Sequence, residues 1–421
     1  MSNNKPEVPG RKRAVTAAVF GNVLEWYDFA IYAFMATLIA KKFFPTGDEV
    51  SSLLSTFAAF GVGFVLRPLG GIVIGRIGDV KGRKAALLLT IALMAVGTVM
   101  IGLAPTYEAI GIAAPAIVVI ARLIQGFSAG GEWGTSTAFI VEWAPENRRG
   151  LYGSLQQCSV AGGLLLGSAT AALISTLLTN EAVEQWGWRI PFLLGAVIGP
   201  VGWYMRRHIE DTPAFQQQAT AKPPSTTSGA NLVLKAFGFT VLWTVSYYIF
   251  LTYMPTFLQK HVHLSRAQAL WSVSAGLLVL IVASPLLGYL SDRVGRKPLL
   301  LTSCAAFVVL PYPLLSFMLS NASLTAIVAC QLLLALAIAC FSGPGPAAIS
   351  EIFPTQGRTM GISIGYSLSV AVFGGFAPFI ATWLIAKTGN PVSPAFYVMA
   401  AAFVTFIALA RMEDRAHAPL A

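Results

Sequence analysis

The sequence predicts an all-α protein that crosses a membrane many times. Of its 421 residues, 56% are hydrophobic and only 11% are charged, and the mean hydropathy is +0.69. A soluble domain carries about 25% charged residues. Glycine and proline interrupt the apolar blocks, and the alternating strands of a membrane β-barrel are not seen, so helices are the expected way to satisfy the backbone in lipid.

Twelve apolar blocks are each about long enough to cross a hydrocarbon core of about 30 Å. We therefore expect transmembrane helices at residues 14–38, 51–75, 84–104, 112–142, 150–178, 190–206, 232–258, 267–290, 298–319, 323–350, 359–386 and 393–411. The first block has no small-residue cleavage site before Glu25 and Asp28. It is expected to be a first transmembrane helix and not a cleaved signal peptide.

Lysine and arginine concentrate in alternate loops, which predicts the orientation of the chain. With a cytoplasmic N-terminus, only Lys41, Lys42, Arg189, Lys260, Arg266 and Lys387 fall outside. The basic residues assigned to the cytoplasm are Arg11, Lys12, Arg13, Arg76, Lys81, Arg83, Lys84, Arg148, Arg149, Arg206, Arg207, Arg293, Arg296, Lys297, Arg358 and Arg411. Both termini are then cytoplasmic, and the net charge of +10 needs no nucleic-acid partner because no single face collects it.

Two loop motifs occur twice, which predicts two related halves. The loop from Gly75 to Lys84 is repeated from Gly288 to Lys297 at an offset of 213 residues. A second motif, a glutamate followed by a proline and an arginine, is repeated at an offset of 209 residues. We expect two pseudo-symmetric six-helix bundles, residues 1–206 and 231–421, joined by a polar cytoplasmic connector at 207–230.

These repeated loops are candidates for gating. Their glycines permit a tight turn and close helix approach, and Asp79 can cap the incoming helix or pair with a nearby arginine. Two interpretations stay open: an anchor that fixes topology at the anionic leaflet, or a gate that locks the inner side while the outer side is open. The candidate residues are Gly75, Asp79, Gly82, Arg83, Lys84, Gly288, Asp292, Arg293, Gly295, Arg296, Glu142, Arg149, Glu351 and Arg358.

The paired loops resemble the signature loop of the major facilitator superfamily, along essentially the whole chain. Four further stretches, residues 21–29, 66–71, 122–132 and 186–192, resemble the metabolite:proton symporter branch, whose members carry citrate, 2-oxoglutarate, shikimate, proline or betaine. The resemblance implies the major facilitator fold and a bacterial inner membrane protein that imports an organic solute with protons. It also implies alternating access driven by the proton gradient, without a cofactor.

Four charged residues inside the apolar blocks are candidates for proton coupling: Glu25, Asp28, Arg122 and Glu132. Carboxylates at membrane depth are costly and usually line a cavity or pair with a cation. Asp28 with Arg122 resembles the acid and arginine of related sugar-proton porters, and we expect an ion pair whose protonation frees Arg122 for a substrate carboxylate. A permanent structural pair is the alternative. Glu132 either relays the proton inward, pairs with Arg67 or caps loop residues.

The candidate substrate residues are Arg122, Arg67, Tyr27, Gln331, Tyr247 and Tyr248. Gln331 is the position that corresponds to Arg122 in the second half. The tyrosines can face lipid, can bind a carboxylate through their hydroxyls, or can form an aromatic box for a quaternary ammonium. Because Arg122 and Arg67 supply positive charge, we expect a di- or tricarboxylate such as citrate or 2-oxoglutarate. A proline/betaine symporter is the alternative, followed by a drug effluxer or a transporter-like sensor.

The remaining features favour packing over chemistry. Gly126, Gly130 and Gly134 recur at every fourth position, a spacing typical of close helix packing. The four cysteines and four histidines show no metal-ligand spacing. We therefore expect no metal site and no catalytic residue, and a monomer surrounded by membrane lipid that binds a small solute and protons.

Overall fold

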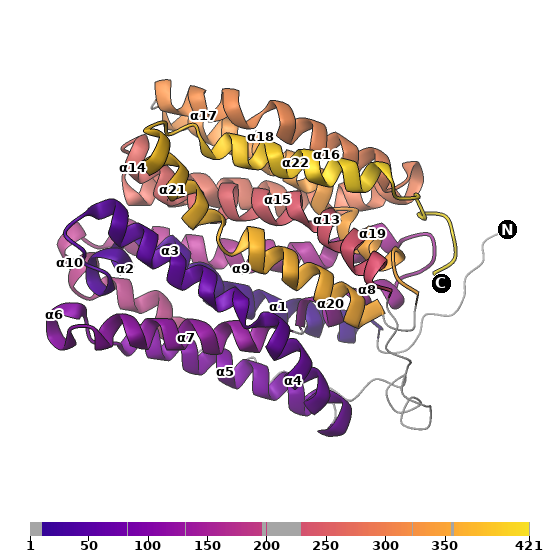
Figure 1. The fold of residues 1–421 in the computed structure, drawn as a ribbon, viewed down its shortest axis with the longest axis horizontal. Helices are drawn as coiled ribbons and strands as arrows, with labels where there is room; N and C mark the ends of the chain where they lie inside the picture. Colours follow the sequence, from indigo (N-terminus) through magenta and orange to yellow (C-terminus); the bar gives the residue numbers. More distant parts are fainter. Residues whose placement is uncertain are drawn as a thin grey trace.

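The computed structural model describes residues 11–81, 83–130, 132–195, 199, 229–321, 323–354 and 358–420. Every regular element among these residues is helical. Figure 1 shows the helices running side by side along the long axis of the molecule, with the first half of the chain packed against the second. The predicted connector lies outside the described residues except for Gly229 and Ala230.

The helices of the first half begin and end close to the expected spans. They are α1 (Arg11–Phe34), α2 (Ala36–Phe43), α3 (Glu49–Val65), α4 (Arg67–Lys81), α5 (Arg83–Leu103), α6 (Tyr107–Ile110), α7 (Ala113–Ala129), α8 (Glu132–Glu142), α9 (Arg149–Leu177), α10 (Asn180–Gln185) and the 3₁₀ turn η1 (Gly187–Arg189).

The second half continues the same pattern, with two π-helical segments. It contains α13 (Ala230–Tyr247), η2 (Tyr248–Tyr253), α14 (Met254–His261), α15 (Arg266–Val294), α16 (Lys297–Val309), α17 (Pro311–Ser320), α18 (Leu324–Ser342), α19 (Gly345–Glu351), α20 (Arg358–Ser369), η3 (Val370–Gly374), α21 (Ala377–Thr388) and α22 (Pro394–Ala410). The π-helical segments are η2 and η3.

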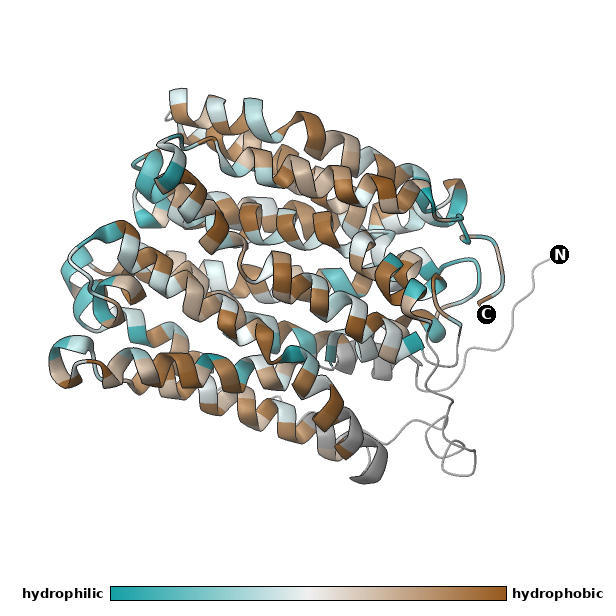
Figure 2. Ribbon diagram, viewed as in Figure 1, coloured by the Kyte–Doolittle hydropathy of each residue, from teal (hydrophilic) through white to brown (hydrophobic). Residues whose placement is uncertain are grey.

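Most of the predicted spans have a matching helix. Among the described residues, seven helices are long and apolar enough to cross a membrane, and two bent pairs bring the number to nine. Two shorter apolar helices, Leu88–Leu103 and Pro394–Ala410, match two further spans. The span predicted at 190–206 lies mostly outside the described residues. Figure 2 shows apolar residues along the middle of the bundle and hydrophilic residues gathered at its two ends.

The main seam between the halves is formed by α9 and α15. Glycine allows their close approach, because a Cβ added to Gly288 would lie 2.6 Å from the carbonyl oxygen of Gly150. Gly288 lies within α15 and not in the predicted turn. The turn is made instead by Gly295, whose φ is +98°. The helix pairs α8 with α20 and α3 with α21 also join the halves.

Within the first half, glycines bring α7 against α3 and α4. A Cβ at Gly126 would lie 1.5 Å from the carbonyl oxygen of Gly63, and one at Gly130 would lie 1.9 Å from that of Arg67. The predicted close packing at these two positions is confirmed. Because α4 carries Arg67 and α7 carries Arg122, this packing places both arginines in the same part of the bundle.

Replacement of Gly126 by alanine should destabilise the protein. The new methyl group has no space against the Gly63 backbone, and overpacking of this kind costs about 1–3 kcal/mol. We expect a lower apparent melting temperature in detergent for Gly126→Ala. Gly162→Ala is the control, because its Cβ would meet only the Val23 side chain at 3.4 Å. Equal melting temperatures for the two variants would contradict the packing.

Candidate functional site

A small cavity lies between the two halves and is lined mainly by aromatic rings. Its volume of about 20 Å³ leaves room for one water molecule. The first half contributes Trp26, Trp133, Gln157 and Val160, and the second half contributes Trp243, Thr244, Tyr247, Tyr248 and Tyr366. We call the six aromatic side chains of this set the aromatic box.

The aromatic box is tightly packed. Trp133 stacks on Tyr366 with ring centroids 3.7 Å apart and an interplanar angle of 6°, and it meets Trp243 edge-on at 5.6 Å. The Trp243 indole donates to the Ser342 hydroxyl at 3.0 Å. Among the described residues, the hydroxyls of Tyr247 and Tyr248 have no hydrogen-bond partner. These buried groups are available to a polar ligand or water.

Arg67 borders the aromatic box and is held mainly by ring faces. Its guanidinium carbon lies 4.5 Å from the centroid of Phe64, 4.9 Å from that of Phe29 and 5.8 Å from that of Trp26. The arginine also interacts electrostatically with the Tyr366 hydroxyl of the box. Only 2% of Arg67 is exposed, so this charge is stabilised by aromatic quadrupoles.

Arg122 is completely buried beside the same Phe29 ring. Its guanidinium carbon lies 4.5 Å from the centroid of Phe29, 4.7 Å from that of Tyr32 and 4.8 Å from that of Phe60. Nη1 donates to Gln125 Oε1 at 2.8 Å. Within the described part of the chain, Nε and Nη2 have no hydrogen-bond partner. Both buried arginines therefore keep N–H groups that have no hydrogen-bond partner among the described residues.

The predicted ion pair between Asp28 and Arg122 is not formed in this structure. Instead, Gln125 Nε2 donates to Thr98 Oγ1 at 2.9 Å, and the Thr98 hydroxyl faces the Asp28 carboxyl as a hydrogen-bonding group. A Cβ added to Gly195 would lie 2.5 Å from Asp28 Oδ1 and 2.7 Å from the Thr98 methyl group, so both groups lie close to this glycine. The side chain of Arg122 turns along its own helix toward Gln125 and not toward Asp28. Arg122 and Asp28 are therefore connected only through the side chains of Gln125 and Thr98 among the described contacts.

The two predicted glutamates occupy different places. Glu25 is half-buried in α1 and contributes to the electrostatic surroundings of Tyr248 and Tyr366, so it lies near the aromatic box. Glu132 is the first residue of α8, after the break that follows α7. Both glutamates have interaction partners, and their predicted roles in proton transfer stay predictions.

Four of the six predicted substrate residues lie outside the lining of the cavity: Arg67 and Arg122, described above, and Tyr27 and Gln331. The Tyr27 hydroxyl donates to the carbonyl of Pro191 at 2.9 Å, and Gln331 lies buried in α18, where its backbone faces Gly276 of α15. Conversely, the cavity is lined by Trp26, Trp133 and Tyr366, which were not predicted as substrate residues. The available signal was an aromatic ring directly after an intramembrane glutamate, which occurs at Trp26 and at Trp133.

One end of the bundle is closed by ion pairs between the halves, one of them buried and one with an exposed glutamate, and we call it the arginine end. Arg358 of α20 contacts Glu142 of α8 at 2.9 Å, and Arg149 of α9 contacts Glu351 of α19 at 3.4 Å. These are the residues of the repeated motif, exchanged between the halves. Each half therefore supplies the glutamate that binds the arginine of the other.

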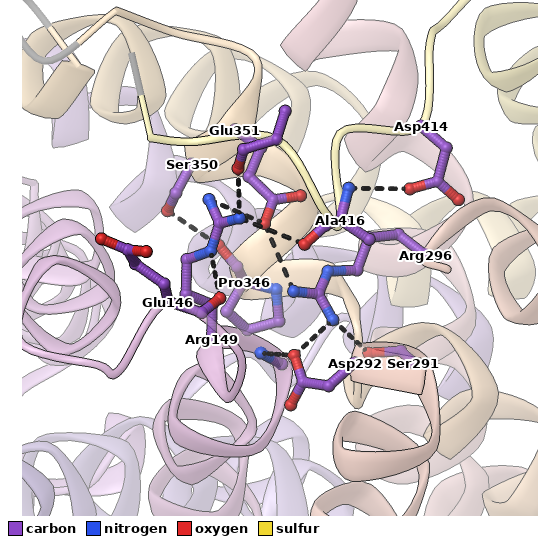
Figure 3. Close-up of polar contacts among 12 residues, drawn as sticks. Glu146, Arg149, Ser291, Asp292, Arg296, Pro346, Ser350, Glu351, Asp414 and Ala416 are labelled. Carbon is purple, nitrogen blue, oxygen red and sulfur yellow. Dashed lines mark hydrogen bonds and ion pairs between the residues drawn. The ribbon is translucent and has the colours of Figure 1, made fainter. Parts of the chain in front are cut away.

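Asp292 and Arg296 extend the network at the arginine end (Figure 3). Arg296 contacts Asp292 at 2.7 Å and Glu351 at 3.3 Å. The Asp292 carboxylate also accepts from the backbone N–H groups of Gly150 and Leu151 at 2.7 and 2.9 Å. Asp292 thus caps α9 of the opposite half, where an anion is favoured by the helix dipole.

Two parts of the predicted gate stand apart from this network. Arg293 is exposed and lies over the Tyr289 ring at 4.5 Å. In the first loop, Gly82 lies outside the described residues. The burial and contacts of Gly75, Asp79, Arg83 and Lys84 are not described either.

The opposite end is also bridged between the halves. Lys260 of α14 pairs with Glu49 of α3, and the Thr37 hydroxyl donates to Gln259 at 3.4 Å. A cavity of about 310 Å³ lies here, lined mainly by α2 and α3 residues together with Lys260. Deeper, Phe57 meets Tyr253 at 5.6 Å and Phe60 meets Tyr248 at 6.0 Å. With contacts above and below it, the aromatic box is occluded in this conformation.

Comparison with known families and structures agrees with this architecture. Residues 14–232 match the family described as sugar (and other) transporter, and residues 236–420 match the major facilitator superfamily. The xylose–proton symporter XylE bound to 6-bromo-6-deoxy-D-glucose superposes with a TM-score of 0.79 at 17% identity, over 96% of this chain and 95% of that one. At such low identity the likeness establishes the fold, which is the predicted major facilitator fold.

The curated relatives are more similar in sequence. The proline/betaine transporter of Escherichia coli K12 is 35% identical over 97% of this chain and 85% of its own length. The glycine betaine/proline/ectoine/pipecolic acid transporter OusA of Dickeya dadantii is also 35% identical, over 97% of this chain and 84% of its own length. The predicted resemblance to the symporter branch is thereby confirmed. The chain belongs to the major facilitator superfamily of transporters, in the family of these proline/betaine transporters.

Proposed function

We propose that this protein is a proton-coupled symporter that imports a small zwitterion of the betaine or proline type by alternating access. The observation that carries the proposal is the aromatic box with Arg67 at its edge. A zwitterion needs two poles recognised close together, and these two features supply them. The names of the curated relatives support the same class of substrate.

The aromatic box suits the cationic pole. A quaternary ammonium has no N–H to donate, so it is recognised by ring faces, at about 0.5–2 kcal/mol for each cation–π contact. The rings of Trp26, Trp133 and Trp243 line the cavity together with three tyrosines. A secondary ammonium such as that of proline can in addition donate to the unpartnered Tyr247 and Tyr248 hydroxyls.

Arg67 suits the anionic pole. Its guanidinium lies over Trp26 and interacts electrostatically with Tyr366, so it reaches the edge of the box from which a carboxylate would project. The cavity lining has no basic side chain of its own among the described residues. The expected di- or tricarboxylate would bring two or three negative charges into this aromatic lining, so the comparisons and the site both favour the zwitterion over that expectation.

In this proposal Asp28 carries the proton. Arg122 donates to Gln125 and Gln125 donates to Thr98, and the Thr98 hydroxyl interacts with the Asp28 carboxyl. Protonation removes the charge of Asp28 and adds an O–H donor to it. The Thr98 hydroxyl is then no longer held toward a carboxylate, so we expect it to reorient, to bind Gln125 less tightly and to release Arg122 toward the site. No cofactor enters these steps, and the proton gradient supplies the energy.

The arginine end is assigned to the cytoplasm and acts as the inner gate. Its residues belong to the loops with the predicted cytoplasmic excess of arginine and lysine, which supports a cytoplasmic position for both termini at a bacterial inner membrane. The exchanged pairs hold the gate closed, and they must separate when the protein opens inward. The protein functions as a monomer in contact with lipid.

The test of this function is uptake into proteoliposomes with an imposed inward proton gradient. We expect gradient-dependent accumulation of labelled betaine or proline, and no accumulation of citrate or 2-oxoglutarate. Accumulation of a carboxylate alone would overturn the substrate class. Export of solute under the same gradient would support efflux instead.

Trp133→Leu should weaken accumulation at low substrate concentration, because it removes the ring that stacks on Tyr366 and meets Trp243. Loss of a cation–π contact of up to about 2 kcal/mol corresponds to roughly a thirtyfold rise in KM. The control is Trp186→Leu, which changes a half-exposed tryptophan outside the cavity. If both variants transport betaine with the wild-type KM, the aromatic box is not the binding site.

Asp28→Asn should abolish proton-driven accumulation but leave counterflow of substrate. Gln125→Leu should produce the same separation, with accumulation reduced about tenfold, because one hydrogen bond to a charged group is lost. Thr240→Val serves as the control, since its hydroxyl bonds only to its own helix at Ala236 among the described contacts. Loss of counterflow together with accumulation in Asp28→Asn would leave the coupling role unsupported.

A further inference from the structure

The segment after α22 lies across the arginine end. We call residues 411–420 the strap. In Figure 1 this yellow C-terminal segment runs past the ends of α22 and α16 toward α19 and α8. Ala416 in its middle is only 5% exposed. The strap is therefore packed into the structure at the place where the two halves meet.

The strap is anchored to the second half by Asp414 and Lys297. Asp414 Oδ2 accepts from the backbone N–H of Lys297 at 2.9 Å, at the N-terminus of α16. In return, Lys297 Nζ donates to the carbonyls of Ala410 and Met412 at 3.2 and 2.9 Å. Gly295 makes room for this contact, because a Cβ there would lie 2.5 Å from Asp414 Oδ2. These bonds stay within one half.

The strap is also held by the first half, through Arg149. Nη2 of Arg149 donates to the carbonyl of Ala416 at 3.1 Å and to that of Ala418 at 2.6 Å. The same guanidinium contacts Glu351 of α19 through Nη1. Figure 3 shows Arg149 between Glu351 and Ala416. One buried arginine of the first half thus binds the second half twice, once at Glu351 and once at the strap.

We propose that the strap is a latch that stabilises the closed state of the inner gate. When the halves separate at this end, Arg149 leaves Ala416 and Ala418 as well as Glu351, while Asp414 keeps the strap on the second half. The bonds to Arg149 exist only in the closed state, so they bias the equilibrium toward it. Release of the strap weakens the gate but leaves the pair of Arg149 and Glu351 in place. The inference rests on the proposed gate.

Cys158 provides a native reporter for this equilibrium. It lies in α9, and its thiol donates to the carbonyl of Ile281 in α15 at 3.4 Å, across the seam between the halves. Separation of the two helices should expose the thiol to alkylation. The experiment uses a full-length variant that keeps Cys158 and has alanine at Cys304, Cys330 and Cys340, with N-ethylmaleimide as the probe. Retained counterflow shows that each variant is folded.

Asp414→Ala should raise the rate of Cys158 alkylation about fivefold, the factor that corresponds to loss of one hydrogen bond to Arg149 in the closed state, because a strap that is no longer held on the second half binds Arg149 less well. Deletion of residues 413–421 should raise it at least as much. The matched control is Glu413→Ala, since Glu413 is exposed and pairs only with Arg415 at 3.8 Å among the described contacts. Equal rates for wild type and the deletion would overturn the latch.

A further variant separates failure of the latch from failure of the gate. Glu351→Gln removes the carboxylate between Arg149 and Arg296, so it should raise alkylation of Cys158 even with the strap intact. If Glu351→Gln raises the rate and the deletion does not, the gate stands and the latch is overturned. If neither variant changes the rate, both the gate and the latch are overturned.

Discussion

The exchange of glutamate and arginine between the halves is the interaction on which the rest of the structure depends. Arg149 and Glu351 are each 4% exposed in their side chains, whereas Arg358 is 1% exposed and its partner Glu142 is 42% exposed. Removing one partner of a fully buried pair such as Arg149 and Glu351 costs about 3–5 kcal/mol, because a desolvated charge is left behind. The pairs thus fix how α8 and α9 meet α19 and α20, and this alignment brings aromatic rings from both halves together at the cavity.

The same physics makes the closed gate reversible. A buried ion pair contributes little net stability, because desolvation offsets much of the attraction. When the end opens, water can hydrate both partners, so the two states can lie close in energy. A transporter needs this balance, since a gate built from apolar packing alone would expose its surface to water on opening. Asp292 adds a bond of the same kind by capping a helix of the other half.

The centre of the molecule differs from the arginine end because its buried positive charge exceeds its buried negative charge. Arg67 and Arg122 lie around the Phe29 ring with no ion-pair partner for Arg122 among the described residues. Ring faces lower the cost of burying the two guanidinium groups but do not neutralise them. Such a site attracts anionic groups, and in the proposed mechanism these are the carboxylate of Asp28 and that of a zwitterionic substrate. Competition between the two carboxylates would then couple the proton to the substrate.

Much of this arrangement could be predicted from the sequence. Hydropathy and chain length predicted the spans, and the repeated motifs predicted the related halves, since both signals are local or periodic. The exchange of Glu142 and Glu351 between halves was not predicted, although the motif contained all four residues. The direct pair of Asp28 and Arg122 was wrong for this conformation, because sequence spacing does not give the direction of a side chain around its helix. Only Tyr247 and Tyr248 of the aromatic box were predicted, since Trp26, Trp133 and Tyr366 come together through tertiary packing alone.

The aromatic box as the binding site of a betaine-type zwitterion is tested by equilibrium binding, monitored by tryptophan fluorescence of the purified protein without any proton gradient. Trp26, Trp133 and Trp243 line the cavity, so a ligand that enters the aromatic box must change their emission. We expect a saturable change with betaine that is lost in Arg67→Gln, and no change with citrate. A saturable change with citrate and none with betaine or proline would contradict it.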